Sequence, residues 1–170
     1  MVSCGFYSLA GSIPPHIKSI SIPLVENQTS DFDISEALTD KIILQFNESG
    51  ILLVENEGDA NSILKGVIKK ITDGPYSYDK SESISEYRYK VDVKILWYDN
   101  TKEKNIIDKN YSGFGAYGLS GDISSDGIDN DNDGKIDSED DNEFGEPRSF
   151  AAKVALNKIA EDILNDILTT

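Results

Sequence analysis

Residues 87–98 read YRYKVDVKILWY, the clearest alternation of apolar and polar side chains in the chain. Successive side chains of an extended strand point to opposite sides, so this segment has one apolar side and one charged side. The apolar side carries Tyr87, Tyr89, Val91, Val93, Ile95 and Trp97, and the charged side carries Arg88, Lys90, Asp92 and Lys94. The pattern predicts a half-buried strand. Another apolar surface must cover it, because such burial stabilises a fold by roughly 25 cal/mol per Å².

Two amphipathic helical patterns can supply that cover. The first begins near residues 30–34, places apolar side chains at four-residue spacing and ends at Ser49 and Gly50. Its stripe consists of Ile34, Leu38, Ile42 and Phe46. The second pattern covers about residues 148–168, and its stripe consists of Ala152, Leu156, Ile159, Ile163 and Ile167. We expect both helices to lie on the apolar side of the sheet.

Three further segments are predicted as strands, at about residues 16–24, 63–71 and 105–117. The second of them could continue through Tyr76 and Tyr78. The short apolar run at residues 51–54 is not assigned to an element. The expected fold class is therefore α+β, in the order strand, helix, three strands, helix, with both helices on one face of a four-stranded, mostly antiparallel or mixed sheet.

The charge of the chain is concentrated in one segment. Residues 122–146 contain eleven acidic side chains and one lysine, a charge of −10, so the remaining residues account for −5 of the formal net charge of −15. This balance, with no basic cluster along the sequence, argues against nucleic acid as a partner. At 170 residues the chain fits one domain, residues 1–170, with an acidic insertion at about residues 119–147.

Cys4 is the only cysteine, which excludes an internal disulfide and a cysteine-rich zinc site. The residues around it, Val2-Ser3-Cys4-Gly5, resemble the end of a bacterial lipoprotein signal, although the hydrophobic region that should precede them is missing. We predict lipidation of Cys4; a buried or incidental thiol is the alternative. No apolar run is long enough to span a bilayer.

Two other signals are weaker. His16 is the only histidine, which removes most nucleophile and base pairs, and we expect it to be a strand residue. Gly113, Gly115 and Gly118 have the spacing of a dinucleotide-binding loop, but no helix pattern follows them directly. We therefore set a nucleotide site aside.

The acidic insertion contains a calcium-loop pattern. Carboxylates alternate, a glycine follows at Gly134, and the candidate ligands fall at positions one, three, five, seven, nine and twelve of a twelve-residue loop. These ligands are Asp129, Asp131, Asp133, the backbone carbonyl of Lys135, Asp137 and Asp140. The last position departs from an EF-hand, because it is an aspartate in place of the longer glutamate. We predict a structural Ca²⁺ site; a disordered acidic linker is the alternative.

Several short strings resemble the lipopolysaccharide-assembly lipoprotein family, LptE. They are Cys4-Gly5-Phe6-Tyr7-Ser8, Ile13-Pro14-Pro15-His16-Ile17-Lys18, Ile22-Pro23-Leu24-Val25-Glu26-Asn27-Gln28-Thr29 and Ser85-Glu86-Tyr87. The two helices and the strand at residues 59–66 also agree with the family pattern, whereas the acidic insertion does not belong to it.

The resemblance implies a non-enzymatic outer-membrane lipoprotein that faces the periplasm. Family members sit inside a large β-barrel partner as a plug, bind lipopolysaccharide and help to deliver it to the cell surface. Two alternatives remain open from the residues: a calcium-binding secreted or adhesive domain, and a lipoprotein that activates a cell-wall enzyme.

The polar side of the predicted central strand supplies candidates for contact with lipid phosphates. Arg88, Lys90 and Lys94 are cationic and share that side. A strand face that is only solvated is the competing interpretation.

Overall fold

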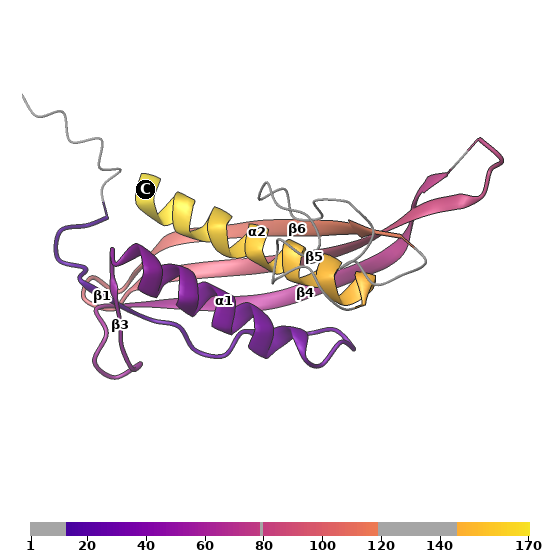
Figure 1. The fold of residues 1–170 in the computed structure, drawn as a ribbon. Coiled ribbons are helices and arrows are strands. Elements are labelled where there is room, and N and C mark those ends of the chain that lie inside the picture. The colour runs from indigo at the N-terminus through magenta and orange to yellow at the C-terminus, as the bar shows by residue number, and fades with distance from the viewer. Residues whose placement is uncertain (1–12, 79, 119–145) are drawn as a thin grey trace, which may run out of the picture.

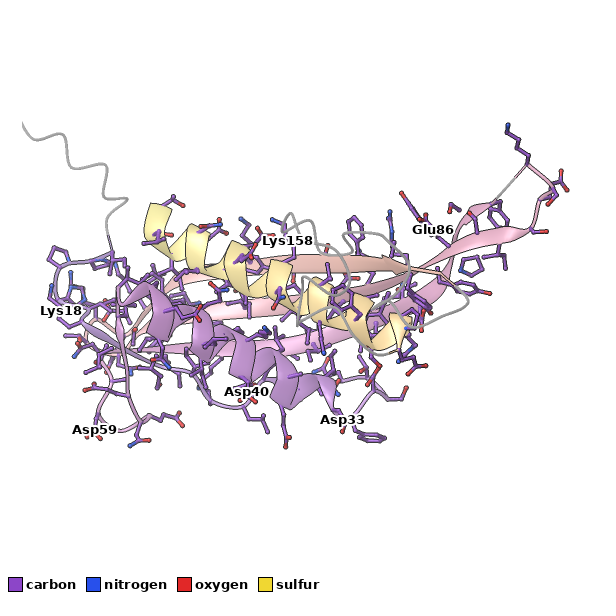
Figure 2. The ribbon with its side chains drawn as sticks, viewed as in Figure 1. Lys18, Asp33, Asp40, Asp59, Glu86 and Lys158 are labelled. Atoms are coloured by element: carbon purple, nitrogen blue, oxygen red, sulfur yellow. The ribbon has the colours of Figure 1, made fainter. Side chains whose placement is uncertain are left out.

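The structure is a computed structural model, and it describes residues 13–78, 80–118 and 146–170. Its centre consists of three long strands, β4 (Ser62–Tyr78), β5 (Ile84–Asp99) and β6 (Lys104–Tyr117), which pair in antiparallel order (Figure 1). The far ends of β4 and β5 project beyond the helices as a hairpin, on which Glu86 stands (Figure 2). The predicted central strand is confirmed as β5, between its two predicted neighbours.

Three short strands complete the sheet. β1 (Ser19–Ser21) lies between β3 (Leu53–Val54) and the start of β4, and β2 (Glu26–Asn27) pairs with β4 further along, all in parallel orientation. The order is β3-β1-β4-β5-β6, with β2 beside β4. The expected count of four strands was therefore wrong. The strand predicted at residues 16–24 is shorter than expected, as β1, while β2 lies just after it at residues 26–27, and the unassigned run at residues 51–54 contains β3.

Both helices lie side by side on one face of the sheet, as predicted (Figure 1). Helix α1 (Ile34–Ser49) buries the four apolar residues of its predicted stripe and ends at Gly50, whose φ of 61° is the left-handed conformation that glycine adopts at low cost. Helix α2 (Pro147–Thr169) buries Leu156, Ile159, Ile163 and Ile167. The α+β class with two helices on one face is confirmed.

The core lies between this helical layer and the covered face of the sheet. Of the six apolar residues predicted for β5, Tyr89, Val91, Val93, Ile95 and Trp97 are at most 1% exposed, and Tyr87 is half-buried. The five buried residues belong to one apolar cluster with the stripes of both helices. The alternation in the sequence therefore identified the covered face residue by residue.

Helix α2 approaches β6 unusually closely because of two glycines. A Cβ atom on Gly113 would lie 2.0 Å from the carbonyl oxygen of Ala155, and one on Gly115 would lie 2.3 Å from that of Ala151. No larger residue fits at either position unless the helix moves away. These glycines, whose spacing imitates a nucleotide-binding loop, instead allow a helix backbone to lie directly over a strand.

Candidate functional site

The face of the sheet that the helices leave uncovered is the candidate functional surface, and we call it the open face. Pairing places its residues in rows across the three long strands. On β4 they are Lys65, Val67, Lys70 and Thr72; on β5 they are Arg88, Lys90, Asp92, Lys94 and Leu96; on β6 they are Asp108, Asn110, Ser112 and Phe114.

The open face is positively charged although the chain as a whole is strongly acidic. It has five cationic side chains and two carboxylates, whereas the formal net charge of the chain is −15. The three candidate phosphate contacts, Arg88, Lys90 and Lys94, all lie here, together with Lys65 and Lys70 of β4. The absence of a basic cluster in the linear sequence was therefore misleading, because strand pairing joins cations that are distant along the chain.

The two lysines among these candidates are already paired with carboxylates. Lys90 lies 2.8 Å from Asp92, and Lys94 lies 2.9 Å from Asp108. All four side chains are about one-third to one-half exposed, so these ion pairs are screened by water and leave part of the lysine charge available to a ligand.

Arg88 differs from both lysines, because no carboxylate neutralises it among the described residues. Its guanidinium carbon lies 3.3 Å from the ring centroid of Tyr76 and 4.1 Å from that of Phe114. Its Nε is buried and has no hydrogen-bond partner within the described ranges. Two aromatic rings thus hold a planar cation in place without cancelling its charge, an arrangement suited to binding an anion at the guanidinium N–H groups.

The open face also contains an apolar hollow beside two of its lysines. A cavity of about 330 Å³ is lined by Leu24, Val67 and Leu96, by the two lysines Lys65 and Lys94, and by one carboxylate, Glu26. Lys65 pairs directly with Leu96, and Val67 with Lys94, so cationic and apolar side chains alternate on adjacent strands. Leu24 at its rim is 62% exposed. This mixture fits a ligand that has both anionic and hydrocarbon parts.

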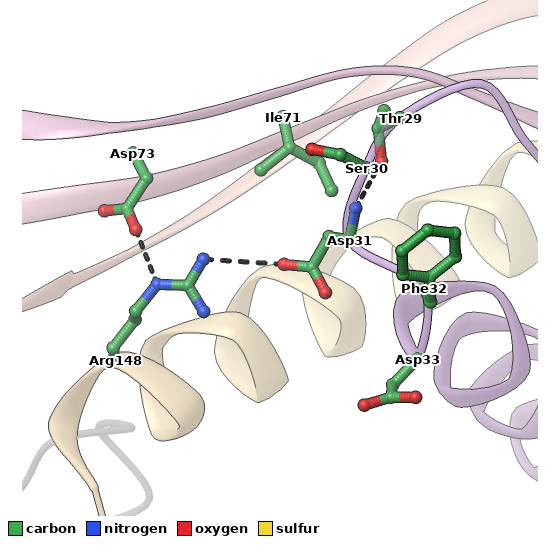
Figure 3. Close-up of a pocket in the computed structure, with 8 residues that line it drawn as sticks. All are labelled: Thr29, Ser30, Asp31, Phe32, Asp33, Ile71, Asp73 and Arg148. Atoms are coloured by element: carbon green, nitrogen blue, oxygen red, sulfur yellow. Dashed lines mark hydrogen bonds and ion pairs between the residues drawn. The ribbon is translucent and has the colours of Figure 1, made fainter.

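A second polar cluster lies near the N-terminal ends of the two helices (Figure 3). Arg148 donates from Nε to Asp73 of β4 at 2.6 Å and lies 3.5 Å from Asp31, which precedes α1. Tyr89 donates to Asp31 at 2.8 Å, and Tyr117 donates to Asp73 at 2.5 Å. Each member has a partner, so the cluster connects α2, β4 and the start of α1.

The electrostatics of this cluster agree with a structural role. The hydrogen bond to Asp73 is the main cause that raises the pKa of the Arg148 guanidinium. Burial and then the hydrogen bond to Asp73 raise the pKa of Tyr117 to about 12. Tyr89 has its pKa raised by burial and by Asp31. A cavity of about 580 Å³ adjoins these groups, and its charged lining consists of the guanidinium of Arg148 and the carboxylates of Asp31, Asp33 and Asp73.

His16 occupies a different position from the one predicted. It lies in a turn before β1, not in a strand, and its Nε2 lies 2.7 Å from the carboxylate of Asp99, which is fully buried. Burial alone would raise the pKa of Asp99, but hydrogen bonds from His16, Lys102 and Thr101 keep it below its usual value. This contact fastens the N-terminal segment to the end of β5.

The other predicted site residues fall outside the part of the chain that the structure describes. They are the lipidation candidate Cys4 and the calcium ligands Asp129, Asp131, Asp133, Lys135, Asp137 and Asp140. Within the described ranges, no group of three or more His, Cys, Asp or Glu side chains is arranged to hold a metal ion. Neither described helix is long and apolar enough to cross a membrane.

The sequence pattern identified the cationic residues of β5 as site candidates but not those of β4, which lie on the same open face. Lys65 and Lys70 were not among the predicted phosphate contacts, yet they face the same side as Arg88. The aromatic partners of Arg88 are also distant in sequence, at Tyr76 and Phe114. Only the register of the three strands reveals these neighbours.

Comparison with known proteins gives a family for the chain. The family model described as "LptE: Lipopolysaccharide-assembly" matches residues 17–170. No curated protein matches the sequence.

Solved structures with a similar fold have very different sequences. The hypothetical protein CT253 from Chlamydia trachomatis has a TM-score of 0.56 at 9% identity, over 91% of this chain and 99% of that one. A minor lipoprotein from Acinetobacter baumannii has a TM-score of 0.52 at 14% identity, over 91% and 92% of the two chains. A putative lipoprotein from Caulobacter crescentus has a TM-score of 0.52 at 8% identity, over 88% of each. At these identities the likeness establishes the fold alone.

Proposed function

Because this chain belongs to the LptE family of lipopolysaccharide-assembly proteins, we propose that it binds lipopolysaccharide on the open face and takes part in its transport without catalysis. The observation that carries the proposal is the charge of Arg88, which no carboxylate among the described residues compensates and which two rings hold beside the other cations of that face. Lipopolysaccharide combines phosphates with acyl chains. The open face offers cations for the former and the hollow around Leu24, Val67 and Leu96 for the latter.

The first test is lipopolysaccharide binding by an Arg88→Ala variant. We expect its affinity to fall about tenfold, because a charge-assisted hydrogen bond to phosphate contributes about 1.5–3 kcal/mol. Lys90→Ala should have a smaller effect, because Lys90 already shares its charge with Asp92. Lys158→Ala is the matched control, since it removes a paired surface cation from α2. Equal affinities for the Arg88 and Lys158 variants would refute phosphate binding at Arg88.

We propose further that the protein acts as the plug and partner of a large outer-membrane β-barrel. Family membership supports this proposal and favours it over a secreted calcium-binding domain or an activator of a cell-wall enzyme. The expected location is the periplasmic side of the outer membrane, with a lipid anchor at Cys4. Co-purification of a barrel from detergent-solubilised envelopes tests the partnership, and loss of membrane attachment in Cys4→Ala tests the anchor. A wild-type protein that purifies without any barrel would contradict the plug role.

We also propose that the acidic insertion binds Ca²⁺ through the residues from Asp129 to Asp140. The spacing of the six candidate oxygen ligands supports this, and the site would relieve repulsion within the most acidic part of the chain. Calorimetric titration of the full chain should give a dissociation constant of about 0.1–1 mM. A double variant Asp131→Asn and Asp133→Asn should abolish the signal, whereas Asp59→Asn should leave it unchanged.

Bound calcium would also reduce repulsion between this insertion and lipid phosphates. On this proposal, chelation weakens lipopolysaccharide binding by the full chain. Unchanged lipopolysaccharide binding after chelation would show that calcium at this site does not affect binding of the lipid.

A further inference from the structure

The two edges of the long-stranded part of the sheet are built differently. β6 is the last strand in the order, and among the described residues no backbone group pairs with its outer edge. The opposite edge belongs to β4, which is covered by β1 and β2 only as far as Ile68. Both strands therefore present unpaired N–H and C=O groups, which are a template for an additional strand.

Only the β4 edge carries the features that prevent such addition. Three register shifts interrupt its pairing with β5, between Ile68 and Lys70, between Pro75 and Ser77, and between Ser77 and Tyr78. Pro75 lacks an N–H group, and Lys69 and Lys70 are exposed beside the edge. Bulges, proline and lysine are the usual means by which proteins protect edge strands.

The β6 edge lacks these protections from Ile107 to Tyr117. Its only register shift lies before this segment, at the pairing of Trp97 and Tyr98, and it contains no proline. Several of its side chains are small, at Ser112, Gly113, Gly115 and Ala116. Its one lysine in this range, Lys109, is bound to Asp166 of α2 at 2.5 Å. Among the described residues, nothing therefore protects this edge from pairing with a partner strand.

An antiparallel pairing of β6 with the β6 of a second copy of this chain does not fit. Paired strands lie about 4.8 Å apart, whereas packed helices need about 8–10 Å between their axes. Because α2 lies directly over β6 at Gly113 and Gly115, pairing two copies through β6 would bring two α2 helices too close together. The occupant must be a strand that carries no helix on this side.

We propose that the outer edge of β6 binds an extended strand of another protein through main-chain hydrogen bonds, as an addition to the sheet. Phe114, which is 49% exposed on the open face, specifies an apolar side chain on the adjoining strand. The identity of the partner rests on the proposed function, which names the β-barrel. The location of the contact rests on the contrast between the two edges.

Amide hydrogen exchange compares the isolated full chain with the complex purified from detergent-solubilised envelopes. In the isolated protein, alternate amides of residues 107–117 should exchange rapidly, because they point away from β5. In the complex, their protection should rise by at least about tenfold, while the unpaired amides of residues 70–78 should not change.

A matched pair of variants then tests the edge directly. Ser112→Lys places a cation on the β6 edge, and Thr72→Lys places one on the β4 edge; both positions are exposed and on the open face. Both variants add the same charge, so any difference reports on the strand edge. We expect Ser112→Lys to reduce complex recovery at least about fivefold and Thr72→Lys to leave it unchanged.

Three results would overturn the inference. Rapid exchange of the β6 amides in the complex would show that a partner binds elsewhere, which leaves the proposed function intact. Protection of the same amides in the isolated chain would show that the chain itself occupies the edge. If no barrel co-purifies at all, both the inference and the proposed partnership fail.

Discussion

The two faces of the sheet consist of alternate residues of the same strands. They differ in burial: side chains on one face are packed in the core, and those on the other remain partly exposed. On the covered face, Trp97 and Val91 are fully buried, and α2 lies against the backbone of β6. On the open face, Arg88 of the same strand has no carboxylate partner within the described ranges. The covered face stabilises the fold, whereas the open face keeps charged and apolar side chains exposed.

This difference gives each face a distinct sensitivity to mutation. A core residue contributes through buried area and close packing, so its replacement lowers the free energy of unfolding. An exposed cation with little native interaction contributes mainly to binding. Substitutions of neighbouring residues should therefore separate stability from affinity.

The largest effect is expected at Trp97, the largest fully buried side chain. Trp97→Ala should lower the free energy of unfolding by about 3–5 kcal/mol, because it leaves a cavity in the core. Leu96→Ala, one residue away on the open face, should cost less than about 1.5 kcal/mol. Urea denaturation measures both. Similar losses for the two variants would mean that the faces do not differ in burial.

The next effect concerns the close approach of α2 to β6. Gly113→Ala should cost about 3 kcal/mol, because its Cβ would meet the carbonyl oxygen of Ala155 and force the helix outward. Ser112→Ala on the open face should change stability by less than about 0.5 kcal/mol. A Gly113→Ala variant as stable as the wild type would show that α2 tolerates displacement from β6.

A smaller effect is expected from the ion pairs of each face. Arg148→Gln should lower stability by about 1 kcal/mol, because it loses contacts with two carboxylates, although the side chain is 43% exposed and therefore screened. Lys94→Gln should cost less than about 0.5 kcal/mol, because its single pair with Asp108 is more exposed. Lipopolysaccharide affinity should show the reverse order, and loss of affinity in Arg148→Gln alone would place the ligand near α2.

The smallest effect is a dependence of stability on alkaline pH. The folded-state pKa of Tyr117 is raised to about 12 from an unfolded value of about 10. Its contribution is therefore fully present below pH 10 and is lost as pH rises from about 10 to 12. Tyr117→Phe should reduce this part of the loss, whereas Tyr98→Phe, on the side of the open face, serves as the control. If the free energy of unfolding depends on pH in the same way for the wild type and Tyr117→Phe, the hydrogen bond of Tyr117 does not contribute to the alkaline loss of stability.

Local patterns predicted the regular elements well. The four-residue spacing in α1 and the alternation in β5 correspond directly to buried side chains, because period and burial are linked by helix and strand geometry. The short parallel strands were not predictable in this way. β2 and β3 contain two residues each, too few to show a period, and they exist because neighbouring segments pair with them.

The candidate site was predicted only in part. Arg88, Lys90 and Lys94 were found because they alternate within one strand. The rings that hold Arg88 come from β4 and β6, and the two glycines under α2 resembled a nucleotide-binding motif until the helix position was known. Spacing along the chain carries no information about neighbours across strands.

The sequence alone determined which side chains of the central strand are buried and which helices cover them, because hydrophobic periodicity acts within each element. It also determined the concentration of negative charge in one insertion. The tertiary structure decided that lysines of β4 join Arg88 on one face, that Arg148 connects both helices to the sheet, and that β6 is the last strand of the sheet in the part of the chain that the structure describes. These features depend on strand order and register, which arise when distant segments pack together.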